Sequence, residues 1–70
     1  MTSPIRCEIR VRGRLGETLL SAFPDLEPQV HDGETVLAGT LQDQAALHGA
    51  LARIEALGLE LLEIRRVSPA

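Results

Sequence analysis

Residues 5–14 read IRCEIRVRGR, and residues 5–12 alternate strictly between apolar and charged side chains. The apolar positions are Ile5, Cys7, Ile9 and Val11, and the charged positions are Arg6, Glu8, Arg10 and Arg12. Successive side chains of a β-strand point to opposite faces of its sheet. This period of two therefore predicts a half-buried strand, with the apolar set on the buried face.

Beyond this strand the sequence predicts a short helix and then an edge strand. The apolar side chains of residues 15–23 recur at the spacing of one helix face, at Leu15, Leu19, Leu20 and Phe23. Pro24 ends this helix, because a proline disfavours the α conformation in the residue before it. Residues 26–31 alternate again, with Leu26, Pro28 and Val30 on one face. Proline cannot donate to the hydrogen-bond ladder of a sheet, so Pro28 places this strand at an edge.

The next segment predicts a tight hairpin that leads into a central strand. Asp32-Gly33 is a dipeptide favoured in two-residue hairpin turns. Residues 35–41 are apolar on both faces, which is typical of a strand in the middle of a sheet. Within this strand, Gly39 indicates a bulge or the close approach of another backbone.

Residues 42–57 predict the main helix. Apolar side chains recur there at steps of three and four residues, at Leu47, Ala50, Leu51, Ile54 and Leu57. We expect Thr40 to cap the start of the helix, with Asp43 three residues on as in a capping box. Gly58 follows the last apolar position, as a glycine after a helix C-terminus does.

Residues 59–67 read as a final strand. Its alternation places Leu62 and Ile64 inward and leaves Leu59 and Leu61 on the outer face. Residues 68–70, Ser-Pro-Ala, are expected to fray. The residues expected to be largely buried in the core are Ile9, Val30, Leu51, Ile54 and Ile64.

The expected element order is strand, helix, strand, strand, helix, strand. Right-handed crossovers in both strand–helix–strand units give an α+β fold, the ferredoxin-like βαββαβ sandwich. Its antiparallel sheet has the order 4-1-3-2, with two helices on one face. We expect one domain spanning residues 1–70, ordered from about residue 5 to residue 67.

Four stretches carry a resemblance to known sequences. They are IRVRG at 9–13, DGETVL at 32–37, DQAALHG at 43–49 and LGLEL at 57–61. Together they resemble a group of short bacterial proteins, about 70 residues long, with no established function. The resemblance extends over about residues 5–66. It implies a small autonomous domain from a GC-rich bacterium, and it implies no activity and no site residue.

Composition narrows the possible functions. The chain has 70 residues and a net charge of −3, so nothing attracts it globally to nucleic acid or to an anionic membrane. Cys7 is the only cysteine, which excludes a disulfide within one chain. The sequence has no apolar run long enough to span a bilayer and no secretory signal at its start. We therefore expect a cytoplasmic protein without membrane association.

No catalytic, metal or cofactor motif is present. Cys7 falls on the inward face of the first strand, where a free thiol behaves as a small apolar group. His31 and His48 do not belong to a metal-ligand spacing and are interpreted as surface residues. Gly13 and Gly16 form a Gly-x-x-Gly that is too short to cradle a phosphate. The sequence thus predicts no cofactor and leans against an enzyme.

The arginine-rich face is the one constellation with a possible function. Domains of this fold that bind RNA stack bases on aromatic side chains, but Phe23 is the only aromatic residue in this chain. Acidic neighbours also offset the arginines, so the composition disfavours nucleic-acid binding. A solvated, cross-strand-paired face and a protein contact surface both stay open. The candidate interface residues are Arg6, Glu8, Arg10, Arg12, Leu61, Glu63 and Arg65.

The leading hypothesis is a small non-enzymatic interaction module that acts as a homodimer or with a larger protein. The first alternative is a small-ligand-binding protein or cofactor-free enzyme, with its pocket at a dimer interface. The second alternative is a nucleic-acid binder acting through the arginine-rich sheet face.

Overall fold

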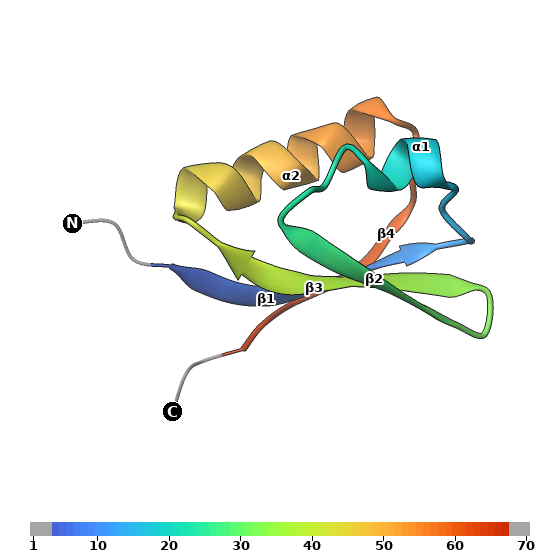
Figure 1. Cartoon of the computed structure of the whole chain (residues 1–70), viewed down its shortest axis with the longest axis horizontal. Coiled ribbons are helices and arrows are strands. Elements are labelled where there is room, and N and C mark those ends of the chain that lie inside the picture. The colour runs from blue at the N-terminus through green and yellow to red at the C-terminus, as the bar shows by residue number, and fades with distance from the viewer. Residues whose placement is uncertain (1–3, 68–70) are drawn as a thin grey trace.

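The computed structural model describes residues 4–67 and shows an α+β sandwich of two layers (Figure 1). Its elements in chain order are β1 (Ile5–Arg12), α1 (Glu17–Leu20), β2 (Leu26–His31), β3 (Glu34–Leu41), α2 (Gln44–Ala56) and β4 (Leu61–Arg66). Both helices lie on the same face of the sheet and leave the other face open (Figure 1). The expected fraying of Ser68, Pro69 and Ala70 lies outside the described residues.

The sheet has four antiparallel strands in the order β2-β3-β1-β4, which is β4-β1-β3-β2 from the opposite edge. The alternating segment Ile5–Arg12 and the doubly apolar segment Glu34–Leu41 form the two central strands. The strand that contains Pro28 lies at one edge. In a central strand the N–H of every residue bonds to one neighbouring strand or the other, and proline lacks this donor, so its placement at an edge follows from its chemistry.

The hairpin between β2 and β3 is confirmed. His31 pairs with Glu34, so Asp32 and Gly33 form a two-residue turn. Both turn residues have positive φ, 48° at Asp32 and 79° at Gly33. Two-residue turns of this kind match the right-handed twist of the strands, and they need residues that tolerate positive φ.

The core lies between the sheet and the helices. The inward side chains of β1 form its floor, because Cys7, Ile9 and Val11 are all buried, as the alternation predicts. The remaining buried hydrophobic residues are Leu15, Phe23, Leu26, Leu37, Leu41, Leu47, Ala50 and Ile54. One buried polar residue, Thr35, donates its hydroxyl to the carbonyl oxygen of Gly13 over 2.6 Å, and this bond offsets the cost of its burial.

Helix α2 begins two residues later than expected, and its cap differs from the prediction. The N-cap is Asp43, not Thr40: the Asp43 carboxylate accepts a hydrogen bond from the Ala46 amide at 2.9 Å. A carboxylate at this position satisfies an unpaired helix N–H and also interacts favourably with the helix dipole. Thr40 is instead part of β3.

Helix α2 ends at Ala56 with Leu57 as its C-cap, and the predicted glycine follows: Gly58 has φ 73°. The Gly58 amide donates to Glu55 and the Leu59 amide donates to Ile54, each at 3.0 Å. This pair of bonds is a Schellman motif, which requires the left-handed conformation that glycine adopts without steric cost.

Gly39 marks a close approach between two backbones. It lies opposite Leu26 in the ladder between β2 and β3. A Cβ atom at position 39 would lie 2.5 Å from the carbonyl oxygen of Asp25. Only glycine fits this part of β3 without moving the start of β2.

Three of the five expected core residues are less buried than predicted. Ile9 and Ile54 are buried, and Leu51 is half-buried. Val30 and Ile64 are 46% and 37% exposed, so the prediction for them is wrong. They face the helix side, opposite Thr35 and Ile9, but they lie on the two outer strands, where neither helix fully covers them.

The orientation expected for Leu59 and Leu61 is also wrong. Leu59 precedes β4 and packs against the core. The register between β1 and β4 shifts between Arg10 and Val11, and this bulge places Leu61 opposite the inward-facing Val11. An extra residue in one strand resets the alternation of its side chains. Leu61 therefore does not belong to the open face.

Candidate interaction surfaces

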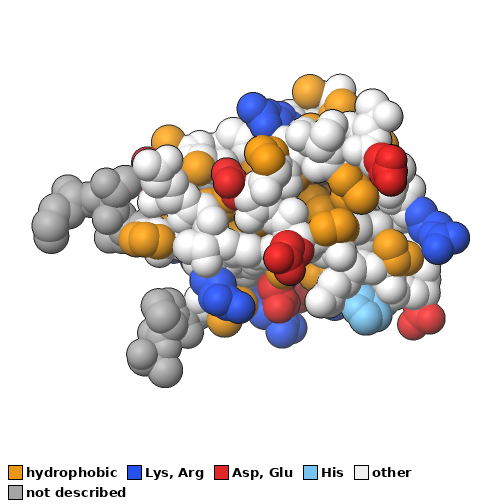
Figure 2. Space-filling model, in the orientation of Figure 1, with side chains coloured by type: hydrophobic (Ala, Val, Ile, Leu, Met, Phe, Trp, Pro, Cys, Tyr) orange, Lys and Arg blue, Asp and Glu red, His pale blue; other side chains and the backbone are white. Residues whose placement is uncertain are grey.

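The open face of the sheet carries the charged positions of β1. Directly opposite residues of antiparallel strands share a face, so the register extends this face across the sheet. Arg10 lies opposite Val36 on one side and Glu63 on the other, and Glu8 lies opposite Ala38 and Arg65. Basic and acidic side chains stand next to one another along the lower border of the molecule, on the side away from the helices (Figure 2).

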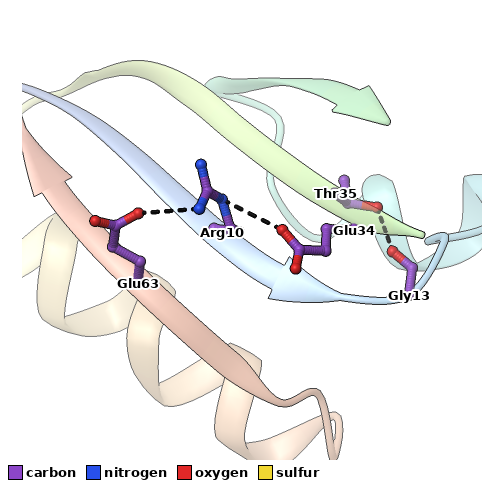
Figure 3. Close-up of polar contacts among 5 residues, drawn as sticks. All are labelled: Arg10, Gly13, Glu34, Thr35 and Glu63. Carbon is purple, nitrogen blue, oxygen red and sulfur yellow. Dashed lines mark hydrogen bonds and ion pairs between the residues drawn. The ribbon is translucent and has the colours of Figure 1, made fainter. Parts of the chain in front are cut away.

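Arg10 is the centre of an ion-pair network on this face (Figure 3). Its Nη1 lies 3.3 Å from Oε1 of Glu63 on β4, and its Nε lies 3.5 Å from Oε1 of Glu34 on β3. The three side chains are 38–46% exposed. Solvent-exposed pairs of this kind contribute only about 0–1 kcal/mol each. Their main effect is to neutralise the arginine from both neighbouring strands.

Arg12 is neutralised in a similar way at the end of β1. Its Nε lies 3.0 Å from Oε1 of Glu60, which precedes β4. The Arg12 amide also donates to the carbonyl oxygen of Glu60 at 3.0 Å, so backbone and side chain join the same two residues. The alternation of β1 identifies the arginines, but it does not identify Glu34 and Glu60 as partners. The Asp32-Gly33 turn sets only the register of β2 and β3. The registers that bring Glu34 and Glu60 to β1 join segments far apart in the sequence, so no short-range signal places either partner.

Six of the seven candidate interface residues fall on one face. Arg6, Glu8, Arg10 and Arg12 alternate along β1, and Glu63 and Arg65 join them from β4 through the register. Leu61 is the exception, since it lies opposite Val11. The apolar patch expected at the centre of the open face is therefore reduced to the partly buried Val36 and Ala38. The role of these residues as an interface stays a prediction.

A second surface runs along β4, and it combines exposed apolar side chains with backbone groups that no other strand within residues 4–67 pairs with. Leu61 and Ile64 are 43% and 37% exposed. The Val67 amide donates to Arg6 at 2.8 Å, which makes positions 67, 65 and 63 the residues whose backbone groups bond to β1. The backbone groups of Ile64 and Arg66 consequently point away from β1. We call Leu61, Ile64 and Arg66 the β4 edge.

The opposite edge of the sheet is closed to further pairing at its centre. It is formed by β2, which contains Pro28, a residue without a backbone N–H. A proline on an edge strand removes a donor that an added strand would need. Within β4, by contrast, every residue has an N–H.

Cys7 belongs to the core and not to a reactive site. It is a free cysteine with 1% of its surface exposed. Burial raises the pKa of its thiol, and the charge of Arg66 on the neighbouring strand opposes this shift. Since the thiolate is the nucleophile, a buried thiol with a raised pKa reacts slowly.

The described residues do not assemble a metal site. Within residues 4–67 no group of three or more His, Cys, Asp or Glu side chains could hold an ion. His31 and His48 are both exposed, His31 at the end of β2 and His48 on α2. Phe23 is buried in the core at 4% exposure, so it cannot stack on a nucleotide base. No helix of this part of the chain is long and apolar enough to cross a membrane.

The surface formed by residues 4–67 includes two hollows. The first, of 210 Å³, lies between α2 and the segment that joins α1 to β2; its lining is mostly apolar, with Asp25 and Arg53 as its charged residues. Arg53 spans this gap, because its Nη1 donates to the carbonyl oxygen of Ala22 at 2.6 Å. The second, of 570 Å³, is a wide hollow with a polar lining that includes Glu8 and Glu27. Sites for drug-sized ligands are mainly apolar clefts of about 300–1,000 Å³, and neither hollow combines that size with that lining.

Comparison with known proteins identifies the family. No curated protein matches the chain, and no solved structure matches it. A protein-family model matches residues 6–65, which extend from the second residue of β1 to the penultimate residue of β4. The chain belongs to the family described as Domain of unknown function (DUF8691).

Proposed function

We propose that this domain is a non-enzymatic interaction module that acts as a homodimer or with a larger protein. One observation carries the proposal: the β4 edge combines two exposed large apolar side chains with outward-facing backbone groups on a strand that contains no proline. Exposed apolar groups next to a polar border are typical of contact surfaces. Here Glu63, Arg65 and Arg66 supply the border.

The charged open face of the sheet is a less favourable contact surface than the β4 edge. Its central arginine is already paired with Glu34 and Glu63, so binding an acidic partner there would first require breaking both ion pairs. The same pairing weakens the case for nucleic acid, because phosphate binding draws on unneutralised Arg and Lys. Among the hypotheses considered, protein contact through the β4 edge fits the charges and the exposure best.

A small-ligand function has less support. The hollow beside α2 has an apolar lining, but its 210 Å³ would accommodate only a fragment. Arg53 is also engaged with the carbonyl oxygen of Ala22 across it.

We also propose that the fold is ferredoxin-like and that the protein is cytoplasmic. The fold proposal is supported by the element order, by the central position of β1 and β3, and by the two helices on one face. Backbone NOEs between the facing pairs Arg10–Val36 and Ile9–Ile64 would test the strand order directly. The lone cysteine supports a reducing compartment. A fusion to a fluorescent protein, expressed in the native host, would test the location.

Site-specific photocrosslinking in the native host tests the interaction function. A photoreactive p-benzoylphenylalanine would replace Leu61 on the β4 edge, and in a matched control it would replace the exposed Ala52 on α2. The proposal expects a discrete crosslinked species from position 61 and none from position 52. Mass spectrometry would identify its partner as a second copy or as one specific protein. Absence of any discrete species at position 61, or equal crosslinking at both positions, would refute the function.

A further inference from the structure

We propose that the β4 edge binds a second copy of this chain, in an antiparallel register centred on Ile64. This inference rests on the proposed interaction function and names its partner. The two β4 strands would join two sheets into one continuous sheet across a two-fold axis. In such an isologous contact the pairs are reciprocal: where one residue of the first copy meets a different residue of the second, the same two positions also meet with the copies exchanged.

The backbone limits which registers are possible. Ile64 and Arg66 direct their N–H and C=O groups away from β1, while residues 63 and 65 direct theirs toward it. An added antiparallel strand must therefore bond to the even-numbered positions. At the same time, directly opposite residues must share a face of the sheet. In every allowed register, therefore, one residue of β4 lies opposite the same residue of the second copy, and the two-fold axis passes between these two residues.

Charge selects one of these registers. When Ile64 lies opposite Ile64 of the second copy, Glu63 lies opposite Arg65 of that copy, and Arg65 opposite its Glu63. A shift centred on residue 63 would set Glu63 against Glu63, and a shift centred on residue 65 would set Arg65 against Arg65. Like charges placed directly opposite destabilise a strand pair, and opposite charges stabilise it.

The selected register also continues the charge pattern of the open face. Within one chain, Arg10 pairs with Glu63 at 3.3 Å, and Glu8 lies opposite Arg65. Across the contact, one row would read Arg10, Glu63, then Arg65 and Glu8 of the second copy, with alternating sign throughout. Arg65 forms no ion pair among residues 4–67, so its charge is available to the second copy.

The apolar side of the edge fits the same arrangement. Ile64 lies on the helix side of the sheet, opposite the buried Ile9, yet it is 37% exposed. A second Ile64 at the two-fold axis would cover it. Burial of apolar surface together with new backbone hydrogen bonds is the usual basis of pairing at a strand edge.

A pair of complementary charge variants tests the register. Glu63→Arg makes both positions of the contact basic, and Arg65→Glu makes both acidic. Each variant alone should dimerise about tenfold more weakly than the native chain, because both cross-strand pairs become repulsive. Mixed together, the two variants should restore association, since each basic position then faces an acidic one. Sedimentation velocity from micromolar to millimolar concentration measures the native chain, each variant alone and the mixture.

Controls separate this contact from changes within one chain. Glu63→Arg removes the ion pair with Arg10, but mixing leaves that loss unchanged, so recovery on mixing reports the contact alone. Glu27→Arg introduces the same charge change on β2 and should leave the dimer intact. If a variant does not fold, the native chain still gives a measurement: the Ile64 amide should become protected from hydrogen exchange as concentration rises.

The outcomes distinguish this inference from the function on which it rests. A native chain that stays monomeric up to millimolar concentration overturns the dimer. A dimer that persists in both single variants, or that Glu27→Arg disrupts, overturns the register. If the chain is monomeric but position 61 crosslinks to a different specific protein, the interaction function stands and the second copy is rejected. If it is monomeric and no crosslink forms, both are rejected.

Discussion

Substituting Gly39 by alanine should destabilise the fold, because this position leaves no room for a side chain. A Cβ atom there would lie 2.5 Å from the Asp25 carbonyl oxygen, 3.1 Å from Cδ2 of Leu26 and 3.3 Å from its Cα. Two of these three atoms belong to the backbone, so a rotamer change cannot relieve the contact. The first residues of β2 would have to move away from β3, which strains the buried Leu26 as well.

The size of the effect follows from two opposing contributions. Overpacking a well-packed site costs roughly 1–3 kcal/mol. Replacing glycine by alanine also restricts the unfolded chain, which stabilises the fold by about 0.4–1 kcal/mol. We therefore expect Gly39→Ala to lower the free energy of unfolding by about 1–2 kcal/mol. For a small domain with ~5 kcal/mol of stability in total, this loss is easily measured.

Gly49→Ala is the matched control. Gly49 lies within α2, and a Cβ atom there would meet nothing within 4 Å. Alanine is a better helix former than glycine by about 0.5–1 kcal/mol, so this variant should be more stable than the native chain. Urea denaturation followed by far-UV circular dichroism would measure both variants. A Gly39→Ala variant that matches or exceeds Gly49→Ala in stability would refute the close approach of β2 and β3.

Three further predictions concern the core. Ile54→Ala should cost roughly 2–5 kcal/mol of unfolding free energy and Leu51→Ala less, because Ile54 is buried and Leu51 half-buried; equal losses in urea titrations would contradict the packing of α2. A thiol reagent should modify Cys7 slowly in the native protein and rapidly in denaturant, and equal rates would show that the thiol is accessible. The chain contains no Lys and no Tyr, so Cys7 is the only side chain whose ordinary pKa lies in the mildly alkaline range. Because burial raises its pKa, the stability that it contributes is complete below the ordinary thiol pKa and is lost as pH rises through the raised value. Thermal melts across this range should show that decline in the native chain and not in Cys7→Ala; a decline that persists in the variant would assign it to another group.

The local patterns of the sequence predicted the elements that short-range chemistry determines. Strict alternation identifies β1 because the pleat of a strand has a period of two. Asp32-Gly33 identifies the hairpin because its backbone needs positive φ at both positions. Gly58 identifies the end of α2 for the same steric reason. Each of these signals lies within a few residues of the structure that it specifies.

The same patterns do not predict what covers a given face. Val30 alternates as a buried residue should, and it does face the helix side, opposite the buried Thr35. It is nevertheless 46% exposed, because β2 is an outer strand and the helices do not cover it there. Periodicity gives the direction of a side chain, whereas its burial depends on which elements, distant in the sequence, pack against it.

The bulge in β4 accounts for the error at the candidate interface. The segment around Leu61 contains no glycine or proline to mark an irregularity, and its apolar run is compatible with either orientation. A shift of one residue moves every side chain beyond it to the other face. Leu61 consequently exchanged sides, and the apolar centre expected on the open face lies instead along the edge of the sheet.

The errors at β4 and the proposed dimer have one physical origin. Leu61 and Ile64 are apolar because a strand with one buried face requires such residues, yet within a single chain both stay more than a third exposed. A chain of 70 residues has few elements with which to cover four strands, and its helices lie on one face only. A second copy aligned along β4 supplies the missing cover with the same apolar residues that need it. Because association then stabilises the folded state, the melting temperature should rise with concentration, which links the stability of this small core to the contact itself.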